Sequence, residues 1–343
     1  MANPQQLRAD VEAITVSEGR QVGSPGHRQV ARFLVGRLRQ LGLDPYRGES
    51  FELPYEQPGM RGCNLAAVLP GLRRELPPVL VGAHYDSVLA APCADDNAAA
   101  VAITLATAGL LARQRRERDV LVVFFDAEEP PYYLSEAMGS IRFYHDQFDA
   151  RGIHCAVIQD LTGHDLTFPV PEAWSSRVQD HPAVQQLRNL VFLTGAESHS
   201  ELPGLLETCP QSPFLPIVAV ANSYVGDMSD HAVFRRNGVP YLFFSCGRWE
   251  HYHEPTDTPD RLSYEKMARL AWYLGLLIAG IADCELPPGE VTADTLDFEL
   301  RSVAQGLGPA LPLLLRLSGL RALRSRQDLD RLLLSLVNLG VTS

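Results

Sequence analysis

Residues 119–129 read DVLVVFFDAEE, and this stretch decides the fold class. Its apolar run has no polar face, which is typical of a central strand in a parallel sheet that helices cover on both sides. Further strand-like runs lie at 63–71 (CNLAAVLPG), 77–87 (PPVLVGAHYDS) and 154–160 (HCAVIQD), with helical patterns among them. This alternation predicts an α/β fold, a three-layer sandwich with a mixed, mostly parallel central sheet flanked by helices.

The remaining elements follow from the same patterns. Helices are expected at 4–18, 27–42, 97–114, 135–147, 181–195, 229–238 and 263–283, and strands at 216–222 and 240–246. The PPGE turn at 287–290 marks a boundary, which divides the chain into a main domain, 1–287, and a helical C-terminal extension, 288–343. The leucine stripes of the extension, at 297–320 and 328–340, need burial either on the main domain or in a homodimer interface, and we expect the first.

The composition excludes several classes of protein. The chain has 343 residues, of which 46% are hydrophobic and 21% charged, so it can bury a large core. A net charge of −11 and the lack of a long basic run argue against a nucleic-acid partner. No stretch approaches the roughly 20 apolar residues of a membrane span, so we expect no membrane partner. Six scattered cysteines without a CxxC pair, together with an amino terminus that lacks a signal-like apolar segment, predict a cytoplasmic protein with free thiols.

Side chains of the kinds that bind divalent metal follow or neighbour the predicted strands. They are His84 in VGAHYDS, Asp95 in CADDNAAA, Glu129 in FFDAEEPP, Asp160 in AVIQDLTG and His253 in HYHEPTDTPDRL. Strand ends are where open α/β sheets place their ligands. Two histidines and three carboxylates are too many for one tetrahedral zinc, but they suit two Zn²⁺ ions that share a carboxylate.

Some of these side chains, taken alone, also have a plain structural explanation. His84 is explained equally well as a hydrogen-bonded core histidine, with Asp86 accepting from its ring. Asp95 is placed to cap the helix that begins after it, unless one of the next two residues does so. His251 competes with His253 for the last position, and we prefer His253 on the motif.

Glu128 and Glu129 are adjacent and follow the apolar strand closely in the sequence. Two adjacent acids at the end of a buried strand need a cation or a solvated cleft. Because neighbouring positions point in different directions, one of them can bind metal while the other transfers protons. A solvated loop pair without a function is the alternative.

Taken together, these segments resemble the co-catalytic, two-zinc exopeptidase family of bacterial leucyl aminopeptidases, aminopeptidase Y and plasma glutamate carboxypeptidase, with glutaminyl cyclases as a divergent branch. The resemblance covers about residues 20–283. Its motifs are GAHYDS, ADDNAAA, FFDAEEPP with the trailing MGS, QDLTG, SDHAVFRRNGVP and HYHEPTDTPDRL, in the family's order. Three alanines follow the ADDN motif, where family members often carry Ser-Gly.

The resemblance implies a metal-dependent exopeptidase, and above all an aminopeptidase that removes N-terminal residues from peptides or aminoacyl amides. By position in the motifs, it implies two Zn²⁺ ions per chain. His84 and Asp160 would hold one ion, Glu129 and His253 the other, and Asp95 would bridge them. The resemblance also implies a cis peptide bond after Asp95.

The resemblance further assigns Glu128 as the general base that acts on a zinc-activated bridging water, and Asp86 as the catalytic aspartate that supports the metal. Substrate contacts are less defined. The oxyanion-stabilising tyrosine of some relatives has no match in register, so Tyr224 is the candidate, and Asp230 and His231 follow it in the same motif region.

Three other functions stay open. A carboxypeptidase or amide hydrolase would use the same scaffold, because the metal ligands alone do not fix which end of a peptide is recognised. A glutaminyl cyclase-like aminoacyltransferase works with one zinc, whereas His84 and Asp160 are both present here. A non-catalytic binding protein of this fold would lack the metal ligands.

Residues 165–215 and 222–230 are expected to form walls of the substrate pocket, because they fall between ligand-bearing strands.

Overall fold

The computed structural model describes residues 1–149, 151–166, 187–287 and 294–338. Within these residues the centre is a nine-stranded mixed sheet of order β1–β3–β5–β4–β6–β9–β7–β8, with β2 paired to β3. The strands are β1 (Asp44–Pro45), β2 (Glu52–Gln57), β3 (Met60–Leu69), β4 (Val79–His84), β5 (Val120–Phe125), β6 (Cys155–Gln159), β7 (Val191–Thr194), β8 (Ile217–Ala219) and β9 (Tyr241–Ser245).

The middle of the sheet consists of four neighbouring parallel strands. β4 pairs in parallel with β5 on one side and with β6 on the other, and β6 pairs in parallel with β9. Every residue of β4, β5 and β6 is buried. The prediction of a mixed sheet with a buried central strand at 119–129 is therefore confirmed, and the C-terminal ends of these strands share one edge.

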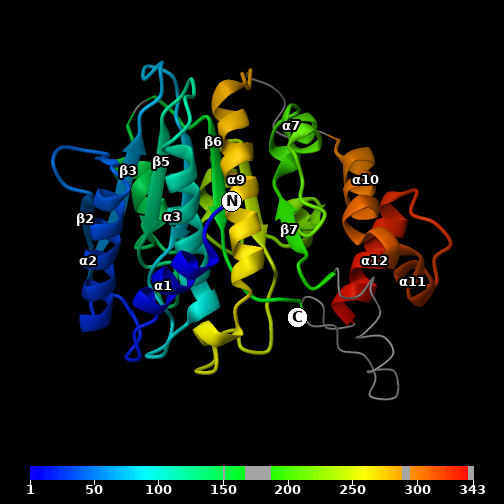
Figure 1. Ribbon diagram of the computed structural model, residues 1–343, viewed down its shortest axis with the longest axis horizontal. Coiled ribbons are helices and arrows are strands. Elements are labelled where there is room, and N and C mark those ends of the chain that lie inside the picture. Colours follow the sequence, from blue (N-terminus) through cyan, green and yellow to red (C-terminus); the bar gives the residue numbers. More distant parts are fainter. Residues whose placement is uncertain (150, 167–186, 288–293, 339–343) are drawn as a thin grey trace.

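Helices cover both faces of the sheet, as Figure 1 shows. They are α1 (Pro4–Ile14), α2 (Pro25–Gln40), α3 (Ala100–Leu111), α4 (Gly139–Arg142), α7 (Leu202–Thr208), α8 (His231–Arg236), α9 (Tyr264–Asp283), α10 (Leu296–Leu307), α11 (Leu311–Leu317) and α12 (Arg326–Asn338). Alternate residues of β5 belong to opposite cores: Val122 to the core that also contains side chains of α2, α3 and α9, and Val123 to the core that also contains side chains of α8 and of the segment around α4. The expected three-layer sandwich is thus confirmed.

The C-terminal helices lie at the β7–β8 end of the molecule (Figure 1). α10 packs against β8. Phe298 and Val303 of α10 and Leu329 and Leu332 of α12 are buried and belong to the same hydrophobic core as α3 and α9. These leucine-rich helices therefore bury apolar side chains on the main domain, whereas a domain boundary at residue 287 and a homodimer stay predictions.

The structure differs from the predicted elements at residues 181–195. The part of this segment from Val191 to Thr194 is strand β7 rather than helix. A short apolar run such as VFLT fits either structure, and its pairing with β8 and β9 decides in favour of a strand. Residues 167–186, which include the rest of the predicted helix up to Gln186, lie outside the described residues.

Two further findings concern the predicted location. No helix in the described part of the chain combines the length and the apolarity that crossing a membrane requires. All six cysteines are unpaired, and Cys93, Cys155 and Cys246 are buried.

Candidate active site

The candidate metal-binding side chains meet at the C-terminal ends of the parallel strands. His84 ends β4, Glu129 and Asp160 follow β5 and β6, and His253 lies in the loop after β9. Asp96 joins them from the turn Ala94–Ala99, which precedes α3. Three groups have ligand-type atoms that all lie within 4.8 Å of one another: His84, Asp96 and Asp160; His84, Glu128 and Glu129; and Asp96, Glu129 and His253.

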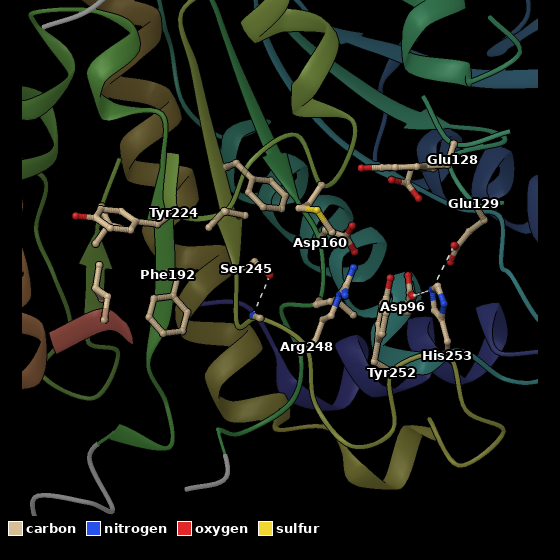
Figure 2. A pocket seen from close by; sticks show the side chains of 18 of the residues that line it. Asp96, Glu128, Glu129, Asp160, Phe192, Tyr224, Ser245, Arg248, Tyr252 and His253 are labelled. Carbon is tan, nitrogen blue, oxygen red and sulfur yellow. Dashed lines mark hydrogen bonds and ion pairs between the residues drawn. The ribbon is translucent and has the colours of Figure 1, made fainter. Parts of the chain in front are cut away.

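Asp96 lies between the two histidines. Its Oδ1 is 3.3 Å from His84 Nε2, and its Oδ2 is 3.2 Å from His253 Nε2. His84 Nε2 is also 3.7 Å from Asp160 Oδ1, and His253 Nε2 is 3.4 Å from Glu129 Oε2, a pair visible in Figure 2. One carboxylate therefore faces two separate histidine–carboxylate pairs, as a shared ligand of a two-metal site does.

Asp95, the bridging ligand expected from the motifs, faces away from this cluster. Its Oδ1 accepts hydrogen bonds from the backbone N–H groups of Gly163 (2.6 Å) and His164 (3.1 Å), and its Oδ2 contacts the His164 ring. A Cβ on Gly163 would lie 2.8 Å from Asp95 Oδ1, so this approach requires glycine. The expectation for Asp95 is corrected to Asp96, and the cis peptide bond likewise joins Asp96 to Asn97.

The cluster fits divalent cations. Atoms that are buried and have no hydrogen-bond partner among the described residues include His84 Nε2, Glu129 Oε1, Asp160 Oδ1 and His253 Nε2. Buried polar atoms without partners are rare and costly in folded proteins. Imidazole nitrogen and carboxylate oxygen are also the ligands that zinc accepts. Cations held between these side chains would satisfy the atoms that the protein leaves unpaired.

The cluster forms one end of a pocket with a volume of about 920 Å³ (Figure 2). The rest of its lining is largely apolar and includes Phe192, Val220 and Met228. Arg248 and Tyr252 line the pocket beside the cluster, and the Arg248 guanidinium lies 4.8 Å from the centre of the Tyr252 ring. The pocket therefore joins an acidic metal-binding end to an apolar end.

Tyr224 lines the pocket, as the sequence predicted for the segment 222–230, but on the side away from the cluster (Figure 2). Its hydroxyl donates to Asp330. Tyr252 is the tyrosine next to the cluster, with its ring stacked on that of His253 at 3.8 Å between centroids. Burial and the nearby carboxylates raise the pKa of Tyr252, so its hydroxyl stays protonated and can donate. Tyr252 thus replaces Tyr224 as the candidate for stabilising an oxyanion.

Asp230 and His231 are both fully buried, and neither is among the described residues that line the pocket. Burial raises the pKa of Asp230 to about 7. The His231 ring stacks on Phe243 at 4.1 Å between centroids, and its Nε2–H donates to the carbonyl of Gly226 at 3.0 Å. The expected substrate contacts are therefore corrected to buried positions, because both side chains point into the protein.

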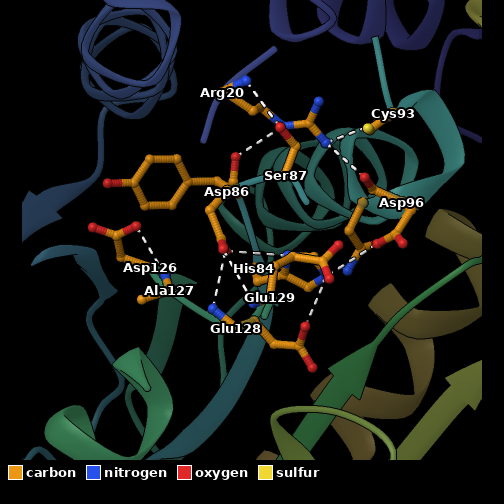
Figure 3. A network of polar contacts seen from close by, with 12 residues as sticks. Arg20, His84, Asp86, Ser87, Cys93, Asp96, Asp126, Ala127, Glu128 and Glu129 are labelled. Carbon is orange, nitrogen blue, oxygen red and sulfur yellow. Dashed lines mark hydrogen bonds and ion pairs between the residues drawn. The ribbon is translucent and has the colours of Figure 1, made fainter. Parts of the chain in front are cut away.

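Asp86 contacts three residues of the cluster and holds them in place (Figure 3). Its carboxylate accepts from the backbone N–H groups of Glu128 (3.1 Å) and Glu129 (3.2 Å), and its Oδ1 lies 3.3 Å from His84 Nδ1. The left-handed φ of 54° at Ala127 turns the chain just before these two glutamates. Asp86 thus orients the His84 ring and fixes the backbone of both glutamates, which is the kind of support a metal-binding histidine needs.

Arg20, in the segment between α1 and α2, fixes the chain that carries Asp96 (Figure 3). Its side chain is fully buried. The guanidinium donates to the backbone carbonyls of Tyr85 (2.9 Å), Pro92 (2.6 Å), Cys93 (2.8 Å) and Asp96 (3.0 Å). One arginine therefore connects the residue after His84 to the turn that presents Asp96.

The acids and histidines shift one another's pKa values when no cation is bound. Burial and then the charge of Asp96 raise the pKa of Glu129 to about 8. Burial likewise raises the pKa of Glu128 well above its usual range. For His253 burial opposes protonation, but the contacts with Asp96 and Glu129 raise its pKa to about 10. Closely packed acids beside charged imidazoles indicate a site adapted to cations.

Sequence reasoning missed Arg20 and Tyr252. Arg20 is a single arginine between two helices, outside every motif, and nothing in the sequence marks it. Tyr252 had a signal, because it directly precedes the histidine His253 that the motif assigns to the metal.

Comparison with known proteins then assigns the family. The model of peptidase family M28 matches residues 64–278, which is more than half of the chain. The chain therefore belongs to peptidase family M28, a family of metallopeptidases. The match contains the strands that carry the cluster and ends before the C-terminal helices.

The individual relatives support the same fold. The chain is 29% identical over 223 residues to the uncharacterized protein YfbL of Escherichia coli strain K12, a match that covers 57% of this chain and 64% of the relative, just under two thirds of its length. Among solved structures, it is similar to the LapA aminopeptidase of Legionella pneumophila (16% identity, 83% of this chain, 71% of that chain, TM-score 0.63). It is also similar to the aminopeptidase of Aneurinibacillus sp. strain AM-1 (15% identity, 85% of this chain, 96% of that chain, TM-score 0.61). A third similar structure is glutaminyl cyclase of Porphyromonas gingivalis (18% identity, 81% of this chain, 98% of that chain, TM-score 0.58). At such low identity these structures show the fold alone.

Proposed function

We propose that this protein is a two-zinc aminopeptidase that removes N-terminal residues from peptides or aminoacyl amides. The observation that carries the proposal is the Asp96 carboxylate, which lies within 3.3 Å of both His84 Nε2 and His253 Nε2. His84 with Asp160 would hold one ion, and His253 with Glu129 the other. Two Zn²⁺ ions bound there would supply an activated water and a Lewis acid for the scissile carbonyl.

Glu128 is the proposed general base. Its backbone is fixed by Asp86, and its Oε2 lies 3.8 Å from His84 Nε2, so the carboxylate faces the cluster. It would take a proton from the attacking water and pass it to the leaving amine. The Tyr252 hydroxyl would donate to the developing oxyanion.

The proposed metal ions at one end of the pocket support recognition of an amine. The acids Asp96, Glu128, Glu129 and Asp160 all line the end of the pocket that holds the cluster. With two Zn²⁺ ions bound these acids would balance the charge of the metals, and a free α-amine of a substrate could bind one of the ions, whereas an internal peptide bond offers no such group. This favours cleavage at the amino end of a peptide.

Arg248 favours the main alternative, a carboxypeptidase or amide hydrolase. It is an exposed cation that lines the same pocket beside Tyr252. A guanidinium in this position is suited to pair with a substrate carboxylate. A glutaminyl cyclase-like reaction is the remaining enzymatic alternative, and it needs only one zinc.

Metal analysis and four kinds of substrate test the proposal. We expect about two zinc ions per purified chain, rapid hydrolysis of leucinamide and no hydrolysis of N-acetyl-leucinamide. Preferred cleavage of N-acetyl dipeptides with a free carboxylate, abolished by Arg248→Gln, would instead establish a carboxypeptidase. Cyclisation of an N-terminal glutamine with one zinc per chain would establish a glutaminyl cyclase.

A cytoplasmic location is also proposed. It is supported by the six unpaired cysteines, since free thiols persist in reducing compartments. Fractionation of cells that express the native gene tests it, with activity expected in the cytosolic fraction.

A further inference from the structure

The far wall of the pocket is built by helix α12, which lies outside the segment 64–278 that matches the family. Asp330, Leu333 and Leu334 of this helix line the same pocket as the metal cluster. The pocket volume of about 920 Å³ is near the upper end of the usual range of ligand sites, roughly 300–1,000 Å³. The cavity is therefore larger than one short aliphatic side chain fills.

Polar contacts hold α12 against the pocket wall. The Tyr224 hydroxyl donates to Asp330, and the Arg326 guanidinium donates to both carboxylate oxygens of the buried Glu299 at 2.7 and 2.8 Å. Glu299, on α10, also accepts from the backbone N–H of Ala221 at 3.0 Å. These contacts join α10, α12 and the segment that carries Tyr224, so the far wall has a defined position relative to the sheet.

The pocket presents exposed apolar side chains. Among the described residues, only seven large apolar side chains are exposed, and Val225 (36%), Met228 (41%) and Leu334 (62%) are three of them. All three line this pocket. Exposed apolar side chains that gather in a pocket, rather than scatter over the surface, indicate an apolar ligand that covers them.

We propose that α12 is a specificity element, and that the pocket between it and the cluster takes a long apolar side chain of the substrate's first residue. This inference rests on the aminopeptidase function proposed above. The α-amine would lie at the end that holds the cluster, and the side chain would extend past Met228 and Phe192 towards Leu334. The preferred substrates carry an N-terminal side chain longer than that of leucine, either aromatic or with six or more carbons.

A homologous series of aminoacyl amides measures the length of this pocket. Amides of alanine, norvaline, norleucine and 2-aminooctanoic acid release only ammonia, so the leaving group adds no apolar area. For the wild-type protein we expect kcat/KM to rise by about fourfold per added methylene through the eight-carbon residue. A plateau or a fall after norvaline would overturn the proposal, because the far wall would then be out of reach.

A matched pair of variants tests the role of α12 itself. Leu334→Asp places a charge at the far wall and should lower the ratio of kcat/KM for 2-aminooctanamide to kcat/KM for alaninamide by about tenfold or more. Leu317→Asp alters a similarly exposed leucine (54%) of α11 that does not line this pocket, and it should leave the whole series unchanged. Equal activity of Leu334→Asp and wild type on the long amide would remove α12 from substrate recognition.

The outcomes separate the two proposals. Hydrolysis of alaninamide with no dependence on chain length overturns only the role of α12 and leaves the aminopeptidase function standing. A zinc-loaded protein that hydrolyses none of the four amides overturns the aminopeptidase function and this inference with it.

Discussion

Arg20 donates from Nη2 to the backbone carbonyl of Asp96 at 3.0 Å, which joins a residue before α2 to the carboxylate at the centre of the cluster. Replacing it by methionine leaves four backbone carbonyls, three of them buried, without the arginine donor. We expect Arg20→Met to lower the free energy of unfolding by roughly 3 kcal/mol or more, since each unsatisfied buried acceptor costs about 1–3 kcal/mol. Zinc affinity should fall as well, because the turn that presents Asp96 loses its anchor.

Urea denaturation and competition with a zinc chelator measure these two effects. Arg32→Met, at an exposed position of α2, is the matched control and should behave as wild type. If Arg20→Met kept both its stability and its zinc affinity, the proposed positioning role of Arg20 would be wrong.

Asp95 and Asp96 differ sharply in their expected roles, although they are adjacent. Asp96→Asn should reduce bound zinc and abolish activity, because Asp96 faces both histidines. Asp95→Asn should retain two zinc ions and mainly lower stability, because Asp95 bonds to Gly163 and His164. Metal analysis of the two purified variants distinguishes them, and the reverse result would restore Asp95 as the shared ligand.

Glu128→Gln removes the proposed proton carrier and keeps the shape of the side chain. We expect kcat to fall by about 10²–10⁴-fold, the usual contribution of a general base, with zinc content unchanged. Glu129→Gln is the comparison, since it should lose zinc as well as activity. A Glu128→Gln protein that turns over at the wild-type rate would exclude Glu128 from proton transfer.

The stability of the zinc-free protein should fall in acid partly through His231. Burial lowers the pKa of His231 to about 4, so the folded state favours the neutral ring, whereas the unfolded chain takes up a proton near the usual pKa of about 6.5. The stabilisation is thus present above pH 6.5 and is lost as the pH falls towards 4. Between pH 7 and pH 5 the loss should be about 2 kcal/mol.

Urea denaturation in the presence of EDTA at pH 7 and pH 5 measures this loss. His231→Gln cannot take up the proton, so its stability should change less between the two pH values than that of wild type. His145→Gln, at an exposed position, should keep the wild-type difference. Identical pH dependence in wild type and His231→Gln would show that His231 does not contribute.

The strands could be predicted because their signal is local. The run VLVVFF of β5 is apolar at every position, and burial on both faces of a sheet demands that pattern. His84, Glu129 and Asp160 follow such runs directly, so the shared edge of the parallel strands brings them together. Their meeting with His253 needed the motif resemblance as well, because His253 lies in a loop.

The choice between Asp95 and Asp96 could not be made from the sequence. Adjacent carboxylates look alike in a motif, and the conformation of the turn decides which of them faces the histidines. Cys93, just before this turn, has a left-handed φ of 45°, and Arg20 holds its carbonyl from a distant part of the chain. Such tertiary contacts leave no periodic pattern, and the same holds for the packing of α12 beside Tyr224.

The proposed activity depends most directly on two metal ions that share Asp96. An X-ray anomalous difference map of zinc-loaded crystals, recorded at the zinc absorption edge, tests this claim. We predict two peaks on either side of the Asp96 carboxylate, one contacted by His84 and Asp160 and the other by Glu129 and His253. A single peak, or a peak that Asp96 does not contact, would contradict the two-metal site.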